Sequence, residues 1–401
     1  MRDELDRRRH VTLGLERIEA LLSLLGDPHH QLRISQVVGT NGKGTTAVAL
    51  AASLEAAGSP AGAYLSPHVL SYTERVVLRG GFVSEDRFAA AMGGVVEVAD
   101  ANGVSASQFE LLTAGALGLF AEEGLEWAVL EAGLGARHDA TSAAAPEAVV
   151  LVNVGLDHTE YLGETVEEIS HEKLASLSSG TVLILGTDDP RVVAAARERC
   201  DEVGAGLLEA AAGEMPTPPV NLPPYAVRDV RLGLRAAEVL LDRALSGEER
   251  ERAARSVLGA LPGRFEVHEV GGVPVVVDGG HNPAGVRATL EAVRSAYGGR
   301  PLGVVFGALR DKDIGSMLTA LQKEARALVL TLPEGDRAAD PARLMREYDP
   351  RDREGRRARV EADVVRAVET AVEETREGDG VVLVTGSLYT AAPVLRWLRE
   401  E

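Results

Sequence analysis

The feature that most constrains this chain is a regular alternation of short apolar runs with longer helix-like stretches. A strand that is apolar along its whole length must be covered on both faces, and parallel strands need long crossovers. The alternation therefore predicts an α/β fold with mostly parallel sheets. The strand candidates are ISQVV (34–38), AGAYL (61–65), WAVLEAG (127–133), AVVLVNVG (148–155), TVLIL (181–185), VPVVV (273–277), PLGVVF (301–306), RALVLT (326–331) and GVVLV (380–384).

The chain has 401 residues, enough for two or three domains. Residues 206–225 contain five prolines and are expected to form a loop. The segment LPGRFE (261–266) resembles a linker, which divides the chain into a larger domain, 1–264, and a smaller domain, 265–401. The charge-dense stretch 349–359 is predicted to be a solvated loop or helix end.

Charge and cysteine content narrow the function classes. The net charge of −19 argues against a nucleic-acid partner, because such a partner needs a basic face. Cys200 is the only cysteine, so no internal disulfide can form. The N-terminus lacks an apolar stretch for secretion, and no run reaches the ~20 apolar residues that span a membrane. We expect a soluble, cytoplasmic monomer.

A glycine-rich loop, GTNGKGTT (39–46), lies between a predicted strand and a predicted helix. Glycines let the backbone approach a phosphate, and the helix N-terminus offers N–H donors. Lys43 can reach the terminal phosphates, and the Thr45 hydroxyl can bind Mg²⁺. The strict P-loop pattern is broken, since Val37 occupies its first glycine position and Gly44 follows the lysine. An ordinary glycine turn is the alternative, but the placement between strand and helix favours phosphate binding.

Further motifs follow the loop in a fixed order. From about Leu13 to the C-terminus, the sequence and order of these motifs resemble those of the folylpolyglutamate synthase/dihydrofolate synthase family of the Mur-ligase superfamily. These motifs are SPHVLSYTERV (66–76), EAGLGARHDAT (131–141), VGLDHTEYLG (154–163), ISHEK (169–173), LPGRFE (261–266), DGGHNP (278–283), GALRDKD (307–313) and TGSLY (385–389).

The resemblance implies a P-loop ATP-binding domain followed by a smaller Rossmann-like domain. It also implies ATP-dependent addition of L-glutamate to the carboxyl group of a folate, with dihydropteroate as a second acceptor in bifunctional members. The carboxylate takes the γ-phosphoryl group of ATP, and the amine of glutamate attacks the acyl phosphate. This chemistry is reasonable, because a carboxylate resists attack by an amine until it is activated, and phosphoryl transfer needs nearby cations.

The resemblance also assigns roles to particular residues. The ATP-binding residues are Gly39, Thr40, Asn41, Gly42, Lys43, Gly44, Thr45, Thr46, Asp229, Arg264 and Asp278. Thr45, Ser66, Glu131, His158 and Lys173 are the implied Mg²⁺ ligands, Lys173 as a carbamate, and a monovalent cation can accompany them. The catalytic residues are Lys43, His158, Lys173 and His281, and the glutamate site contains His281 and Ser387. The pterin side comprises Ser107, Gln108, Phe109, Glu110, His138, Asp139 and Ala140.

Each of these residues also has a simpler structural interpretation. Glu131 could pair with Arg137, Lys173 could be an exposed helical lysine, and Phe109 could be a core residue. His158 could bond backbone, Arg264 could pair across domains, Asp278 and His281 could shape turns, and Ser387 could cap a helix. Two positions depart from the family pattern: Asp229 stands where asparagine is expected, and His138 where an apolar residue is usual.

Three other functions remain open at this point. The chain could be a related ligase for a non-folate carboxylate, a P-loop phosphohydrolase or kinase, or a nucleotide-binding regulatory protein without catalysis. The expected partners are small molecules (a folate or dihydropteroate, L-glutamate and ATP), with no nucleic acid and no membrane.

Overall fold

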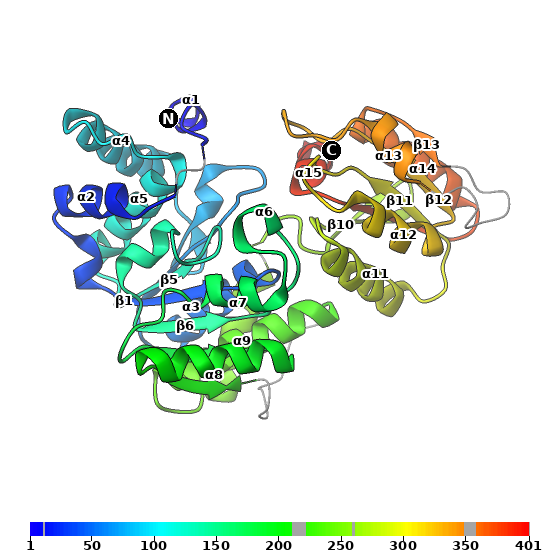
Figure 1. Cartoon of the computed structure of the whole chain (residues 1–401). Helices are drawn as coiled ribbons and strands as arrows, with labels where there is room; N and C mark the ends of the chain where they lie inside the picture. The colour runs from blue at the N-terminus through cyan, green and yellow to red at the C-terminus, as the bar shows by residue number, and fades with distance from the viewer. Residues whose placement is uncertain (11–12, 211–221, 259–260, 349–357, 401) are drawn as a thin grey trace. The chain divides into compact units, whose positions relative to one another are not determined.

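Two α/β units make up the chain, and the computed structural model describes residues 1–10, 13–210, 222–258, 261–348 and 358–400 (Figure 1). Unit 1 comprises Met1–Leu222 and Ala226–Leu261, and unit 2 comprises Pro223–Tyr225 and Pro262–Glu401. The last passage from unit 1 to unit 2 lies between Leu261 and Pro262, inside LPGRFE, the segment that also holds the predicted boundary after Arg264.

Unit 1 is built on a sheet of eight strands within its described residues. In the spatial order β2–β5–β1–β6–β7–β8, all neighbouring strands are parallel, whereas β3 and β4 add antiparallel pairs at the β2 edge. The strands in spatial order are β4 (Gly81–Phe82), β3 (Val76–Leu78), β2 (Ala61–Tyr64), β5 (Trp127–Glu131), β1 (Arg33–Val38), β6 (Ala148–Leu151), β7 (Val182–Leu185) and β8 (Gly206–Glu209).

Helices cover both faces of this sheet. The helices and 3₁₀ turns are α1 (Arg2–Asp6), α2 (Glu16–Leu24), η1 (Pro28–Gln31), α3 (Lys43–Ala56), η2 (Tyr72–Arg75), α4 (Glu85–Ala101), α5 (Gln108–Glu122), η3 (Ala140–Ala144), α6 (Thr159–Leu162), α7 (Val166–Lys173), α8 (Pro190–Val203), α9 (Pro224–Leu240) and α10 (Gly247–Leu258). α2, α4, α5, α7 and α8 pack on one face, and α3, α9 and α10 pack on the other.

Successive side chains of a strand point to opposite faces, which explains these two layers. In β1, Ile34 joins the core under α2, α4 and α5, whereas Val37 joins the core under α3. Both side chains are at most 2% exposed. A strand buried on both faces has no polar alternation, as the apolar runs indicated.

Unit 2 repeats this plan with a six-stranded sheet among its described residues, in which only the β9–β10 pair is antiparallel. The strands in spatial order are β13 (Arg359–Val360), β12 (Ala327–Leu330), β11 (Leu302–Phe306), β14 (Val381–Thr385), β10 (Val273–Val277) and β9 (Glu266–Val270). α11 (Pro283–Tyr297), α12 (Ile314–Glu324) and α13 (Pro341–Glu347) cover one face, and α14 (Val364–Arg376) and α15 (Leu388–Glu400) pack on the other.

All nine predicted strands are present, and the fold class is confirmed. Short strands at or near the sheet edges were missed, because they are two to five residues long and mostly lack an apolar run. One prediction was partly wrong: β8 lies inside the stretch expected to be a proline-rich loop. The rest of that loop at 211–221, and the charge-dense segment at 349–357, lie outside the described residues. Among the described helices, none is both long and apolar enough to cross a bilayer.

Candidate functional site

The glycine loop joins β1 to α3, as the sequence predicts, and α3 begins at Lys43. Gly42 caps this helix with a φ of 83°, in the left-handed region that favours glycine. A Cβ atom at Gly42 would lie only 2.3 Å from Asp229 Oδ2, so a side chain is excluded there on two grounds. The loop therefore has the local geometry of an anion site at a helix N-terminus.

Asn153 and Gly155, whose roles the sequence did not predict, hold the glycine-rich loop in place. Asn153, just after β6, accepts from the Asn41 N–H at 3.1 Å and donates its Nδ2 to the Asn41 carbonyl at 2.8 Å. The Gly155 N–H donates to Thr40 Oγ1 at 2.9 Å. An amide side chain directly after an apolar strand was the available signal. These bonds fix the loop backbone before any ligand arrives.

Two of the predicted metal ligands, Ser66 and Glu131, meet at the carboxyl edge of the sheet, where open α/β sheets bind ligands. Ser66 follows β2 and Glu131 ends β5, and the Ser66 N–H donates to Glu131 Oε2 at 2.8 Å. That oxygen lies 3.2 Å from the position of a Cβ on Gly44. The alternative pairing of Glu131 with Arg137 is wrong, since Arg137 pairs with Glu172 at 2.7 Å.

Lys173 ends α7 and is 5% exposed, so its interpretation as an exposed lysine is wrong. Its Nζ donates to the carbonyl of Gly39 at 2.8 Å, against the glycine-rich loop. Burial, followed by the positive charge of Lys43, lowers the pKa of Lys173 to about 7. The Lys43 ammonium itself bonds the Thr40 carbonyl at 3.4 Å. Two lysines thus approach the same loop.

His158 and Asp229 lie at the same edge with different environments. His158 precedes α6 at a left-handed φ of 52°, its side chain is 39% exposed, and its N–H bonds Asp157. Asp229 on α9 is 2% exposed, and its backbone carbonyl accepts from Thr46 Oγ1 at 3.2 Å. Its carboxylate lies over Gly42, with the Arg228 guanidinium 3.4 Å away. A carboxylate beside a phosphate loop is unfavourable unless a cation offsets it, which Arg228 can do in part.

The predicted pterin-side residues on α5 have structural partners. Ser107 and Glu110 form a reciprocal capping box at the helix start, and Arg17 pairs with Glu110 at 3.1 Å. Gln108 donates to Tyr72 Oη and to the Leu5 carbonyl. These bonds explain the polar residues at the start of α5 without any ligand.

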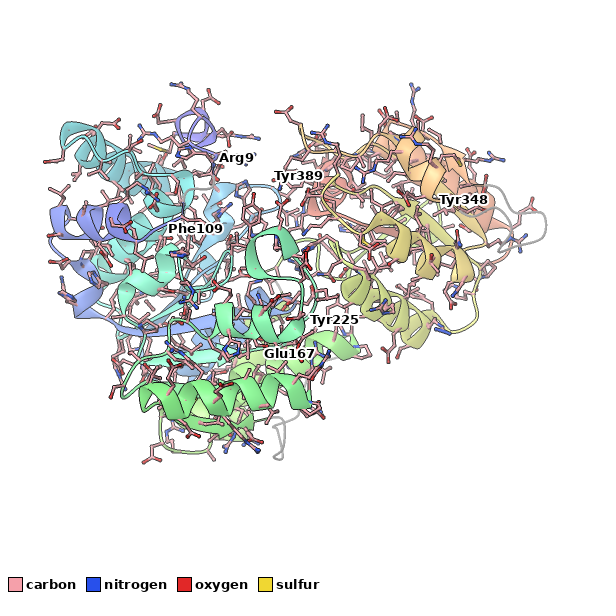
Figure 2. All side chains as sticks on the ribbon, in the orientation of Figure 1. Arg9, Phe109, Glu167, Tyr225, Tyr348 and Tyr389 are labelled. Atoms are coloured by element: carbon pink, nitrogen blue, oxygen red, sulfur yellow. The ribbon has the colours of Figure 1, made fainter. Side chains whose placement is uncertain are left out.

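Phe109, labelled in Figure 2, is half-buried, and its ring lies 5.8 Å from that of Tyr64. Asp139 accepts from the backbone of Gly133, Leu134 and Thr141, and burial raises its pKa. His138 is exposed and Ala140 is buried. Of this group, Phe109 and His138 are the side chains with a surface available to a ligand.

In unit 2, Asp278 lies at the end of β10 and is 3% exposed. Its carboxylate accepts four hydrogen bonds, from Tyr225 Oη, the Phe265 N–H, the Gly280 N–H and Thr289 Oγ1, at 2.6–3.0 Å. The turn-forming interpretation of Asp278 is therefore confirmed. The exposed Arg264 lies nearby, with its Nη1 3.2 Å from the position of a Cβ on Gly279.

The predicted glutamate-site residues lie on loops of unit 2. His281 Nδ1 is 3.0 Å from the Gly279 carbonyl, and the following Asn282 caps α11 through Gly285. Ser387 is 2% exposed, and its Oγ accepts from the Tyr389 N–H at 3.1 Å, as a helix cap does. The capping interpretations hold, and they leave the ligand roles as predictions.

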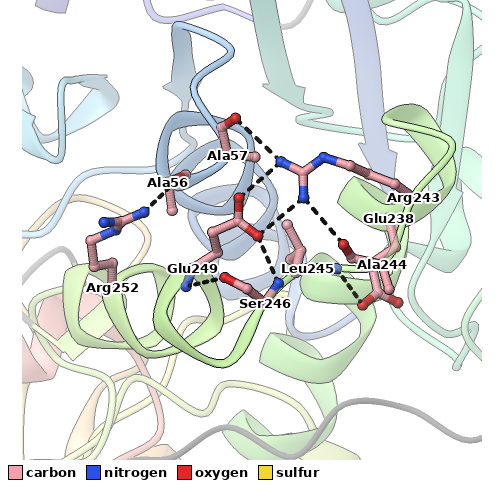
Figure 3. Close-up of polar contacts among 9 residues, drawn as sticks. All are labelled: Ala56, Ala57, Glu238, Arg243, Ala244, Leu245, Ser246, Glu249 and Arg252. Atoms are coloured by element: carbon pink, nitrogen blue, oxygen red, sulfur yellow. Dashed lines mark hydrogen bonds and ion pairs between the residues drawn. The ribbon is translucent and has the colours of Figure 1, made fainter.

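The far end of α3 is secured by arginines from the segment around α10 (Figure 3). Arg252 donates to the Ala56 carbonyl at 2.8 Å, and Arg243 to the Ala57 carbonyl at 3.3 Å. Glu249 pairs with Arg243 at 2.8 Å, which together with the Ser246 N–H lowers its pKa to about 2. Cations suit the carbonyl end of a helix, so these contacts stabilise the helix that carries the phosphate loop.

Residues 37–214 match the family described as Mur ligase middle domain, and residues 263–388 match the one described as Mur ligase, glutamate ligase domain. A probable bifunctional folylpolyglutamate synthase/dihydropteroate synthase of Halobacterium salinarum is 35% identical over 96% of this chain, which spans only 50% of that relative's length. The dihydrofolate synthase/folylpolyglutamate synthase of Escherichia coli is 32% identical over 96% of this chain and 91% of its own. The solved Yersinia pestis enzyme, bifunctional folylpolyglutamate synthase/dihydrofolate synthase complexed with AMPPNP and Mn ion, superposes with a TM-score of 0.83 at 30% identity, covering 98% of this chain and 95% of that one.

Proposed function

This chain belongs to the dihydrofolate synthase/folylpolyglutamate synthase family of Mur ligases, and we propose that it joins L-glutamate to a folate carboxylate with cleavage of ATP. Dihydropteroate is proposed as a second acceptor, because the relatives' names pair the two activities. A cytoplasmic monomer is the proposed state of the protein.

The observation that carries the proposal is the position of Lys173. Its nearly buried ammonium contacts Gly39 of the phosphate loop, and its pKa near 7 leaves a large neutral fraction at physiological pH. A neutral amine can attack CO₂: an N–C bond forms, a proton leaves, and an anionic carbamate results. A simple P-loop phosphohydrolase gives no reason for a buried lysine at this place, whereas the ligase family does.

The phosphate loop is proposed to hold ATP, with Lys43 beside the terminal phosphates and the α3 N-terminus donating N–H groups. Arg264, Asp278 and Asp229 are proposed to contact the nucleotide, as the family resemblance implies. For Asp278 this requires that a ribose hydroxyl share or replace one of the four present donors. His281 and Ser387 are proposed to face the incoming glutamate.

A divalent metal is proposed at the carboxyl edge of unit 1, as Mg²⁺. Glu131, Ser66 and Thr45 offer the hard oxygens that Mg²⁺ prefers, and His158 offers one nitrogen. Few protein donors suffice, since Mg²⁺ usually keeps several waters and binds substrate phosphates. When bound, the ion would offset negative charge on the transferred phosphoryl group. A monovalent cation belongs to the same proposal, on family resemblance alone.

The reaction then proceeds in two balanced steps. The acceptor carboxylate attacks the γ-phosphorus and ADP leaves, which forms an acyl phosphate. The glutamate amine attacks the acyl carbon, inorganic phosphate leaves, and a proton is lost to give the amide. The chain's contribution is to hold the charged groups in line and to surround them with fixed donors.

Product masses test the proposal. The protein is incubated with ATP, Mg²⁺ and L-glutamate, plus either dihydropteroate or tetrahydrofolate. The expected result is a gain of one glutamyl unit on an acceptor, with one ADP formed per bond. Phosphate release that needs no glutamate, with no mass gain on either acceptor, would support the phosphohydrolase alternative. ADP formation only with another carboxylate would support the non-folate ligase.

A further inference from the structure

A second polar cluster lies at the amino end of β1, away from the phosphate loop at its carboxyl end. Asp27 precedes η1, and His29 and His30 lie within it. Each side chain offers one ligand atom, and these three atoms all lie within 4.8 Å of one another. Over the described ranges of the chain, no other group of three or more His, Cys, Asp or Glu side chains meets this spacing.

Within the part of the chain that the structure describes, the hydrogen bonding of this cluster is incomplete. His29 is 9% exposed, and its Nδ1 is buried without a hydrogen-bond partner among the described residues. Asp27 does not cap η1 through its side chain, although it occupies the capping position. A buried polar atom left unpaired costs about 1–3 kcal/mol, so native structures normally pair it. The cluster therefore contains a buried ligand atom, His29 Nδ1, that no described residue satisfies.

The chemistry of the three donors fits a metal ion of borderline softness. Imidazole nitrogen and carboxylate oxygen bind Zn²⁺ at about 2.0–2.2 Å, and three protein ligands with one water make a common coordination set. The two rings lie 4.2 Å apart, centroid to centroid, which places both imidazoles beside the Asp27 carboxylate.

We propose that Asp27, His29 and His30 bind a divalent transition-metal ion, for which Zn²⁺ is the matching probe, with water completing the coordination. The site is distinct from the proposed Mg²⁺ site in both donors and place. The six residues of β1 separate it from the phosphate loop by about 20 Å, at roughly 3.3 Å per residue.

The location indicates a structural role. η1 packs against α5 and β1, and Asp27 has a left-handed φ of 51°, which is uncommon for a residue other than glycine. A metal bound to Asp27 and both histidines would hold this conformation and connect α2 firmly to the central strand. We therefore expect metal binding here to raise thermal stability and to leave turnover unchanged.

The test is a calorimetric titration of the full chain with Zn²⁺, after a chelator has removed bound metal ions. Excess Mg²⁺ is present to occupy the proposed Mg²⁺ site. One Zn²⁺ should bind per chain, and the melting temperature should rise with Zn²⁺. His30→Ala removes an exposed ligand and should weaken binding more than tenfold, since loss of even an outer-shell partner costs about 10- to 100-fold. Asp27→Asn should weaken it as well.

Matched controls separate this site from general metal binding. Asp242 is likewise an aspartate with a left-handed φ, of 50°, but it is exposed and lies outside the cluster, so Asp242→Asn should leave Zn²⁺ binding intact. His268→Ala, at a histidine paired with Glu266, should do the same. An anomalous difference peak between Asp27, His29 and His30 in Zn²⁺-soaked crystals would support the proposal. Unchanged Zn²⁺ affinity in both His30→Ala and Asp27→Asn, or a peak elsewhere only, would overturn it.

Discussion

The glycine-rich loop of unit 1 and the loop after β10 in unit 2 both carry candidate ligand residues. In unit 1 the buried charge is poorly compensated, whereas in unit 2 hydrogen bonds compensate it. At the edge of unit 1, Lys173 is buried against a carbonyl with a strongly lowered pKa, and Lys43 shares the same loop. In unit 2, Asp278 accepts four hydrogen bonds within its own unit. In the first region the burial of a charged group is unfavourable, whereas in the second the buried carboxylate stabilises the local fold through its hydrogen bonds.

This difference shows that two residues can both match family motifs and still differ in role: one can serve a ligand site and the other the local fold. Groups whose pKa is displaced by burial and like charge often belong to functional sites. Buried groups with complete hydrogen bonding often define a local conformation, here the turn that places Phe265 at a φ of 52°. Substitutions in unit 1 should therefore affect chemistry more than stability, and substitutions at Asp278 should do the reverse.

The largest expected effect is the loss of activity in Lys43→Ala. Removing a cation from the developing charge should lower kcat/KM by about 10³-fold, because one preorganised electrostatic contact contributes about 10²–10³. The unfolding midpoint should hardly move, since the Lys43 ammonium makes one long bond of 3.4 Å. Lys323→Ala, at an exposed lysine of α12, is the control. Equal activity of the two variants would contradict the phosphate-binding role.

The next effect is the destabilisation of unit 2 by Asp278→Ala. Four donors lose their acceptor, and we expect a loss of about 3 kcal/mol in the free energy of unfolding. Denaturant unfolding of the full chain measures it, with Asp311→Ala at an exposed position as the control. A fully stable Asp278→Ala protein with lost nucleotide affinity would reverse the comparison and make Asp278 a binding residue first.

A smaller effect is expected on the pH dependence of stability in Lys173→Met. Lys173 binds fewer protons folded than unfolded between pH 7 and 10.5, so its presence makes stability rise with pH across that window. Below pH 7 both states are protonated, and burying the cation costs most. One pKa unit corresponds to about 1.4 kcal/mol, and after relaxation we expect Lys173→Met to be about 2 kcal/mol more stable at pH 6.

This advantage should shrink as the pH rises from 7 towards 10. The measurement is thermal or denaturant unfolding in CO₂-free buffer, which keeps the amine unmodified. Lys323→Met serves as the exposed control and should show no pH-dependent difference. A pH-independent difference for Lys173→Met would mean that Lys173 is charged throughout, and the contrast between the two regions would weaken.

The smallest effect concerns the far end of α3. Glu249→Gln breaks the pair with Arg243, and a partly exposed pair of this kind contributes about 1 kcal/mol or less. The depressed pKa of Glu249 means that this stability is present above its unfolded pKa of 4.5 and is lost as the pH falls towards about 2. Glu251→Gln breaks a more exposed pair on α10 and should cost less. A loss from Glu249→Gln as large as that from Asp278→Ala would remove the distinction between peripheral and buried support.

The sequence permitted a good prediction of the fold because long-range order here follows from local pattern. Each mainly apolar run became an interior strand, since a strand buried on both faces shows no regular polar alternation. The failures lie at sheet edges, where β4, β9 and β13 are largely exposed and carry little hydrophobic signal. The motifs predicted most of the candidate site residues. The role of Asn153 was not predicted, because it depends on contacts with Asn41 in the glycine-rich loop.

By itself, the sequence determined the strand–helix order, the phosphate loop and the set of residues at the carboxyl strand ends, because these depend on local spacing and apolar period. Only the tertiary structure decided which of those residues are buried without a compensating charge and which have complete hydrogen bonding. Lys173 became a buried amine because α7 packs it against Gly39, and Asp278 became a hydrogen-bond centre because Tyr225, Phe265 and Thr289 converge on it. Burial and partner geometry set these properties, and neither is encoded in the spacing of a motif.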